Sequence, residues 1–85
     1  MTRFSIVLTP TAERQLRSLH GSVSKRIIEK LEQIRDDPAR FVKRLQSSPY
    51  YSLRAGDYRA ILGLQLDVWV ILVIKVGHRR HVYER

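Results

Sequence analysis

The sequence contains no cysteine, so a disulfide framework and a thiolate metal site are both excluded. Acidic residues are also scarce, since 8 Asp and Glu stand against 16 Lys and Arg and give a formal net charge of +8. This excess is large for 85 residues and favours a polyanionic partner, either nucleic acid or a strongly acidic protein.

A long hydrophobic segment is missing as well. The longest apolar run, residues 68–76, includes Lys75 and is too short to span a bilayer. The apolar start of the chain breaks at Pro10, which is not typical of a signal peptide. We therefore expect a soluble, cytoplasmic protein that has no membrane partner.

Several common catalytic motifs are absent. The chain has no glycine-rich phosphate loop and no serine-nucleophile motif. His20, His78 and His81 are not accompanied by carboxylates at ligand spacing, so we expect no metal and no cofactor. A metal-free reaction or a pure binding function remains.

The first half of the chain predicts one strand and two helices. Residues 3–8 alternate between apolar and polar side chains, as a half-buried strand does. Thr9 and Pro10 predict the beginning of a helix, which we expect Gly21 to end. A second apolar stripe, capped by one of the serines that follow, continues until an Asp-Pro pair ends it.

The second half predicts three strands. Residues 39–49 are basic and irregular, and strands are expected at 51–54, 58–66 and 68–76, with a hairpin turn at 55–57. The last strand is apolar at nearly every position, which is typical of a strand that is covered on both faces. We expect it to be the central strand.

These elements predict a single α+β domain over residues 1–85, with the order β-α-α-β-β-β. The sheet should be largely antiparallel, with the helical hairpin packed on one face and the other face partly open. Side chains alternate along strands, so Leu53 and Ala60 should point toward the helices, whereas Ser52, Arg54 and Arg59 should share the open face.

The candidate functional residues cluster around the hairpin and the segment after the last strand. Arginines beside groups that transfer protons suit a site that binds phosphate. RNA supplies its own nucleophile, the 2′-hydroxyl, and cleavage then needs a base, cations for the charge on phosphorus and an acid for the leaving 5′-oxygen. Each residue alone is as compatible with a solvated surface or with packing, and only the combination favours this chemistry. The candidates are Arg40, Lys43, Arg44, Tyr50, Ser52, Arg54, Arg59, His78, Arg79, Arg80, His81 and Tyr83.

Two motifs resemble the RelE/ParE toxin superfamily. They are Leu-Arg-Ala-Gly-Asp-Tyr-Arg at 53–59 and Val-Gly-His-Arg-Arg-His-Val-Tyr at 76–83, and the second favours the RelE branch. The resemblance covers essentially the whole chain. It implies a toxin of a prokaryotic type II toxin–antitoxin system that cleaves mRNA in the ribosomal A site through 2′-hydroxyl attack. It also implies a RelB-like antitoxin with an acidic segment, whose complex with the toxin often binds operator DNA.

The resemblance also implies residue roles. Arg54 and Arg59 match hairpin arginines that bind and stabilise the scissile phosphate. Arg79 matches an arginine with a phosphate-stabilising or general-acid role, and Tyr83 matches a tyrosine that stacks on or orients the RNA.

One departure from the family pattern concerns the general base. Several RelE toxins carry lysines where this chain has Tyr50 and Ser52, and one of those lysines is assigned as the base. Serine cannot take that role at neutral pH, so we expect His81, ahead of His78 and Tyr83, to accept the proton. The alternatives are a ParE-like inhibitor of DNA gyrase that catalyses nothing, or a RelE homologue that is weak or only binds its antitoxin.

Overall fold

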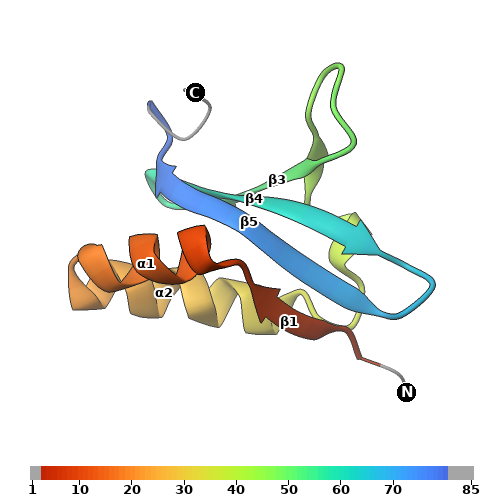
Figure 1. Cartoon of the computed structure of the whole chain (residues 1–85), viewed down its shortest axis with the longest axis horizontal. Coiled ribbons are helices and arrows are strands. Elements are labelled where there is room, and N and C mark those ends of the chain that lie inside the picture. The colour runs from red at the N-terminus through yellow and green to blue at the C-terminus, as the bar shows by residue number, and fades with distance from the viewer. Residues whose placement is uncertain (1–2, 81–85) are drawn as a thin grey trace.

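The computed structural model describes residues 3–80, which fold into two helices, one short 3-10 helix and five strands (Figure 1). In chain order these are β1 Ser5–Leu8, α1 Pro10–Ser18, α2 Gly21–Gln33, the 3-10 helix Pro38–Arg40, β2 Lys43–Arg44, β3 Tyr51–Ala55, β4 Tyr58–Gln65 and β5 Val70–His78. Neither helix in this range is long and apolar enough to cross a membrane.

All strands join one sheet in the order β1-β5-β4-β3-β2. β1 pairs with β5 in parallel, and every other pair is antiparallel. Both helices lie on the same side of the sheet, which leaves its second face without a helical cover (Figure 1). The predicted α+β class and the helical hairpin are confirmed, and β2 is a short additional strand inside a segment that we expected to be irregular.

The junction between the helices differs from the prediction. The Thr9 hydroxyl accepts a hydrogen bond from the Ala12 amide at 3.1 Å, so the predicted N-cap is confirmed. However, α1 ends at Ser18, and Gly21 is the first residue of α2 rather than the end of α1. The cap of α2 is the His20 ring, whose Nδ1 accepts from the Ser22 amide, so none of the serines that follow Gly21 is the cap.

The core lies between the helices and one face of the sheet. Its large, fully buried side chains come from α2, the C-cap of α2 and the inner strands, and each is at most 1% exposed: Ile27, Leu31, Ile34, Leu53, Leu62, Ile71 and Val73. On β3 and β4, Leu53 pairs with Ala60 on this side, whereas Arg54 pairs with Arg59 on the other. The predicted alternation of this hairpin is therefore confirmed.

β5 does not alternate evenly, because its pairing with β4 contains a β-bulge. Ile61 pairs with Lys75 and Leu62 pairs with Val73, so Ile74 is an extra residue without a direct partner. The bulge reverses the alternation, so that Val73 and Val76 are both buried while Lys75 points away from the core. The predicted central position is wrong, because β4 is the middle strand of the five and β5 lies between β4 and the edge strand β1. The second face of β5 is only half covered.

The burial pattern predicts that two leucines, one in β4 and one just after it, differ strongly in how much stability is lost when each is replaced by alanine. Leu62→Ala should lower the free energy of unfolding by about 2–5 kcal/mol, because Leu62 is 0% exposed and its removal leaves a cavity. Leu66→Ala is the matched control, since Leu66 is 63% exposed and surface substitutions change stability by less than about 0.5 kcal/mol. Chemical denaturation of the two variants measures both values, and equal losses would contradict the assigned register.

Candidate functional site

The candidate site is the open face, which we define as the sheet face opposite α1 and α2. One row of directly paired residues crosses it from β2 to β5: Lys43 pairs with Ser52, Ser52 with Ile61, and Ile61 with Lys75. Residues that lie directly opposite one another on neighbouring strands share a face, so both lysines lie on the same side as Ser52. Of these four residues, only Lys43 is exposed; Lys75 is half-buried, and Ser52 and Ile61 are buried.

A second row runs beside the first, where Arg54 pairs with Arg59 and Arg59 pairs with Gly77. The half-buried Arg59 side chain crosses to the first row, where its guanidinium donates a hydrogen bond to the Ser52 hydroxyl at 3.4 Å. Ser52 is 4% exposed, so it offers little surface to a ligand. Its role is to hold the Arg59 guanidinium in place by accepting this hydrogen bond. Gly77, which faces Arg59 from β5, has no side chain.

A shallow cavity of about 290 Å³ lies over this junction of the two rows. Its lining combines β2 and the loop after it with the two hydrogen-bonded residues beneath: Lys43, Arg44, Leu45, Gln46, Ser52 and Arg59. The cavity therefore has cations on two sides, and none of the described residues that line it is acidic. A phosphate group would be attracted to it, because arginine matches phosphate oxygens in shape and charge.

Arg54 is placed at the corner of the open face. Its Nε donates to the Gly56 carbonyl at 3.2 Å, and it also lines a groove of about 230 Å³ that faces α2. Arg26, Lys30 and the acidic Glu29 of α2 line the same groove, so cations outnumber the carboxylate there. Arg54 thus lies opposite Arg59 in the ladder, yet it also belongs to a second cationic surface at the hairpin.

The end of β5 places its three polar residues on different sides. The Arg79 amide donates to the Asp57 carbonyl at 2.8 Å, which extends the β4–β5 ladder by one step and places exposed Arg79 beside the hairpin turn. His78 pairs with Tyr58 on the helix side, where the two rings meet edge to face at 5.4 Å. The structure therefore does not bring His78 together with Arg59, and Arg80 is exposed beyond it.

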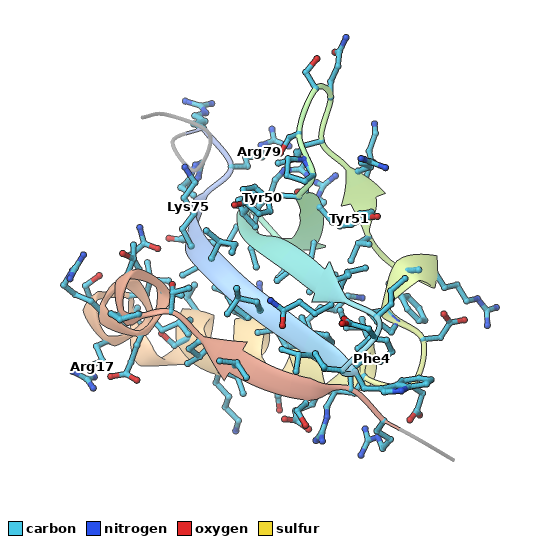
Figure 2. All side chains as sticks on the ribbon, turned by 45° about the vertical axis from the view of Figure 1, so that its right-hand side comes forward. Phe4, Arg17, Tyr50, Tyr51, Lys75 and Arg79 are labelled. Atoms are coloured by element: carbon cyan, nitrogen blue, oxygen red, sulfur yellow. The ribbon has the colours of Figure 1, made fainter. Side chains whose placement is uncertain are left out.

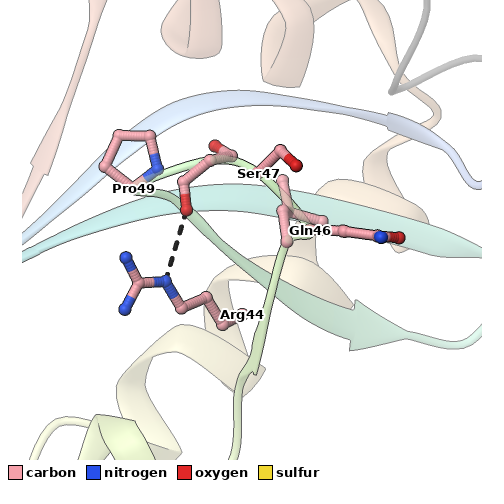
Figure 3. Close-up of a pocket in the computed structure, with 6 residues that line it drawn as sticks. Arg44, Gln46, Ser47 and Pro49 are labelled. Atoms are coloured by element: carbon pink, nitrogen blue, oxygen red, sulfur yellow. Dashed lines mark hydrogen bonds between the residues drawn. The ribbon is translucent and has the colours of Figure 1, made fainter.

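The remaining basic candidates, Arg40 and Arg44, contact groups outside the two rows. The Arg44 Nε donates to the Ser48 carbonyl at 3.3 Å, and its guanidinium lies 6.0 Å from the Tyr51 ring on the helix side of β3 (Figure 3). The hollow beside it, about 640 Å³ in volume, is lined by one loop, residues 44–49, in which Arg44 is the only charge. Arg40 stacks on the Phe41 ring at 5.9 Å. Arg40 is thus peripheral to the two rows, whereas Arg44 also lines the cavity of about 290 Å³ over their junction.

Tyr50 adds an aromatic surface to the open face. A side-chain carbon at Gly63 would lie 3.9 Å from the Tyr50 ring, from Ile74 and from Leu72, so these three side chains surround a flat apolar area. Figure 2 shows Tyr50 toward the same end of the sheet as Lys75 and Arg79, whereas Arg17 of α1 lies well away from it. An aromatic surface beside cations suits the stacking of a nucleobase.

Two predicted residues, His81 and Tyr83, lie outside the described residues. Within residues 3–80, no three His, Asp or Glu side chains come together as a metal site. Lys75 is the open-face residue that sequence reasoning missed. A basic residue inside an apolar strand was its only signal, and the bulge that turns it outward is not visible in the alternation of the sequence.

Comparison with known proteins identifies the family. Residues 6–83 match the model of the ParE toxin of the type II toxin–antitoxin system parDE. Because this match spans most of the chain, the protein belongs to the ParE toxin family and thus to the RelE/ParE superfamily of type II toxins. No curated protein matches the chain in sequence.

Similar solved structures are RelE toxins in complex with antitoxins. The RelBE2 toxin–antitoxin complex of Mycobacterium tuberculosis is 23% identical over 92% of this chain and 100% of that one, with a TM-score of 0.82. The intact E. coli RelBE complex is 24% identical over 91% and 96%, with a TM-score of 0.74. The RelE–RelB complex of Pyrococcus horikoshii is 24% identical over 92% and 97%, with a TM-score of 0.76. At these identities the likeness establishes the fold.

The site predicts that Arg59 is needed for toxicity. Arg59→Ala should remove most of the growth arrest that follows induction, because it deletes the guanidinium that donates a hydrogen bond to Ser52 at the cavity. Losing one preorganised donor to a reacting group typically costs about a hundredfold in rate. Colony counts after induction, at equal soluble expression, measure the effect.

Arg14→Ala is the matched control for this experiment. Arg14 is exposed on α1, and its loss changes the net charge by the same amount. If both variants arrest growth as strongly as the wild type, Arg59 is not part of the toxic site. A lower thermal stability of Arg59→Ala alone would instead identify a structural role.

Proposed function

We propose that this toxin is a ribosome-dependent endoribonuclease that inhibits translation by cleaving mRNA. The observation that carries the proposal is the junction of Arg59 and Ser52 on the open face, flanked by Lys43 and Lys75. Within residues 3–80, none of the five strands contains an Asp or Glu, so no carboxylate on a strand opposes a phosphate there.

The proposed reaction uses the 2′-hydroxyl of the RNA as nucleophile. The 2′-oxygen forms a bond to phosphorus, the bond from phosphorus to the 5′-oxygen breaks, and the products are a 2′,3′-cyclic phosphate and a 5′-hydroxyl. The proton of the 2′-hydroxyl passes to a base, and an acid returns a proton to the leaving 5′-oxygen. This chemistry is balanced without a redox partner or a metal.

The cations have the main catalytic task in this mechanism. Negative charge grows on the oxygens of phosphorus as the transition state forms, and fixed positive groups stabilise it without having to reorganise. Arg59 is held at the cavity by its hydrogen bond to Ser52, and Arg79 lies at the neighbouring end of the ladder. By family resemblance, Arg79 would also be the acid and Tyr83 would stack on the RNA. His81 would be the base, because histidine is the residue type that accepts protons near neutral pH.

The second candidate function is the inhibition of DNA gyrase by binding. The observation in its favour is that the matching family model is named for the ParE toxin, while Ser52 stands where several RelE toxins carry a lysine. In this case the cations of the open face would bind an acidic surface or DNA and catalyse nothing.

A single experiment separates the two candidates. After induction of the toxin, primer extension on translated messages should show new 5′ ends within codons, because the cut depends on the ribosome. Arg59→Ala at equal expression should not produce them. Intact messages together with inhibited gyrase supercoiling would reject the ribonuclease and favour the gyrase inhibitor.

The proposed cytoplasmic partners are the ribosome, the mRNA and a cognate antitoxin. The antitoxin would cover the open face with an acidic segment, placed as a helix or as an added strand, and could hold the complex on operator DNA. The net charge of +8 and the half-covered apolar residues of β5 support a partner of this chemistry.

If the antitoxin covers the open face, we expect a stable complex with the product of a neighbouring small gene. The two proteins should co-purify, and the complex should melt at a higher temperature than the toxin alone. Leu72→Asp on the open face should weaken the affinity of the complex at least about tenfold. The substitution places a negative charge in an apolar contact, and that charge also repels the acidic segment. Isothermal titration measures the affinity.

Ile28→Asp is the control, since Ile28 is 37% exposed on α2, away from the open face. If Ile28→Asp weakens the complex and Leu72→Asp does not, the antitoxin covers the helices instead.

A further inference from the structure

The row from Lys43 to Lys75 places Ser52 between two lysines. Lys43 pairs directly with Ser52 across the β2–β3 ladder, and Lys75 lies two strands away from Ser52 on β5, beyond Ile61. Neighbouring strands lie about 4.8 Å apart, so the row spans about 14 Å from Lys43 to Lys75. Both side chains have long flexible stems, and the face between them carries only a small serine and a buried isoleucine.

Each lysine owes its position to an irregular feature of the sheet. Lys43 lies on β2, a strand of two residues that pairs only with the first part of β3. Lys75 points to the open face because of the bulge at Ile74, since even alternation from Val73 would have directed it into the core. Both irregularities therefore have the same result, which is to bring an ammonium group to the row of Ser52.

The cation set around the cavity is completed by Arg59. It occupies the neighbouring row, and its guanidinium lies against the Ser52 hydroxyl. Lys43 and Arg59 line the same shallow cavity, so a phosphate bound there would contact both. Lys75 does not line this cavity, but it lies on the same face in the row of Ser52, beyond Ile61.

We infer that Lys43 and Lys75 together replace a lysine at position 52, and that their ammonium groups contact the non-bridging oxygens of the scissile phosphate. The inference rests on the proposed ribonuclease function and assigns the lysines a charge-stabilising role in it. They stabilise the charge that builds up while the 2′-oxygen bond to phosphorus forms and the 5′-oxygen bond breaks. An ammonium group has no lone pair, so neither lysine takes the proton of the 2′-hydroxyl in this role.

The test measures single-turnover cleavage of mRNA on programmed ribosomes by full-length protein. Lys43→Met and Lys75→Met remove the charge but keep an unbranched apolar stem, so that Ile61 stays covered. Each should lower the cleavage rate about tenfold to a hundredfold, and the double variant should lose more than either. Lys25→Met, at an exposed position of α2, changes the net charge equally and should stay within about twofold of the wild type.

Arginine variants separate charge from proton transfer. Lys43→Arg and Lys75→Arg should keep most of the rate, because they keep the positive charge. If they are as slow as the methionine variants, the lysines do not act through charge and the inference is wrong. Methionine variants that cleave as fast as Lys25→Met would also overturn it, as would a loss of rate explained by a lower melting temperature.

The same experiment distinguishes failure of the ribonuclease proposal from failure of the inference about the lysines. If the wild-type toxin itself does not cleave ribosome-bound mRNA, the ribonuclease proposal fails before any variant is compared, and the inference fails with it. If the wild type cleaves and the lysine variants do not differ from the control, the function stands and only the inference is overturned.

Discussion

The open face depends on the bulge in the pairing of β4 with β5. An apolar strand with regular alternation would have buried Lys75 together with Val73, and a buried lysine without a partner is strongly unfavourable. The extra residue Ile74 reverses the alternation at this point, so that Val73 and Val76 both fill the core while Lys75 joins the cations outside. One extra residue thus keeps the apolar side chains of β5 in the core and places a cation on the open face.

The sheet is consequently strongly asymmetric. One face is packed against α1 and α2, while the other gathers arginines and lysines whose mutual repulsion disfavours the free protein. An anion on the open face relieves this repulsion, whether it is a phosphate or an acidic peptide. The same surface would then serve both the target and the antitoxin, which would make the two binding events mutually exclusive.

The sequence predicted much of this arrangement. The hairpin motif at 53–59 gave the correct turn, and the alternation along β3 and β4 placed Arg54 and Arg59 on one face and Leu53 and Ala60 on the other. Strand β2, the bulge and the cap of α2 were not predicted, because each depends on tertiary contacts that leave no periodic signal. His78 shows the same limit, since its position next to Arg79 in sequence does not reveal that its ring packs against Tyr58.

The features that sequence reasoning missed matter most for interpreting position 52, where a serine replaces the expected lysine. The family resemblance implies a lysine where this chain has Ser52, and a defective enzyme would be the simple conclusion. The register shows that position 52 is flanked by Lys43 on one side and, beyond Ile61, by Lys75 on the other. A small residue at the centre of the row also leaves room for the Arg59 guanidinium, which a lysine there would repel. A sheet surface can therefore keep its charge while the residues that supply it move to neighbouring strands.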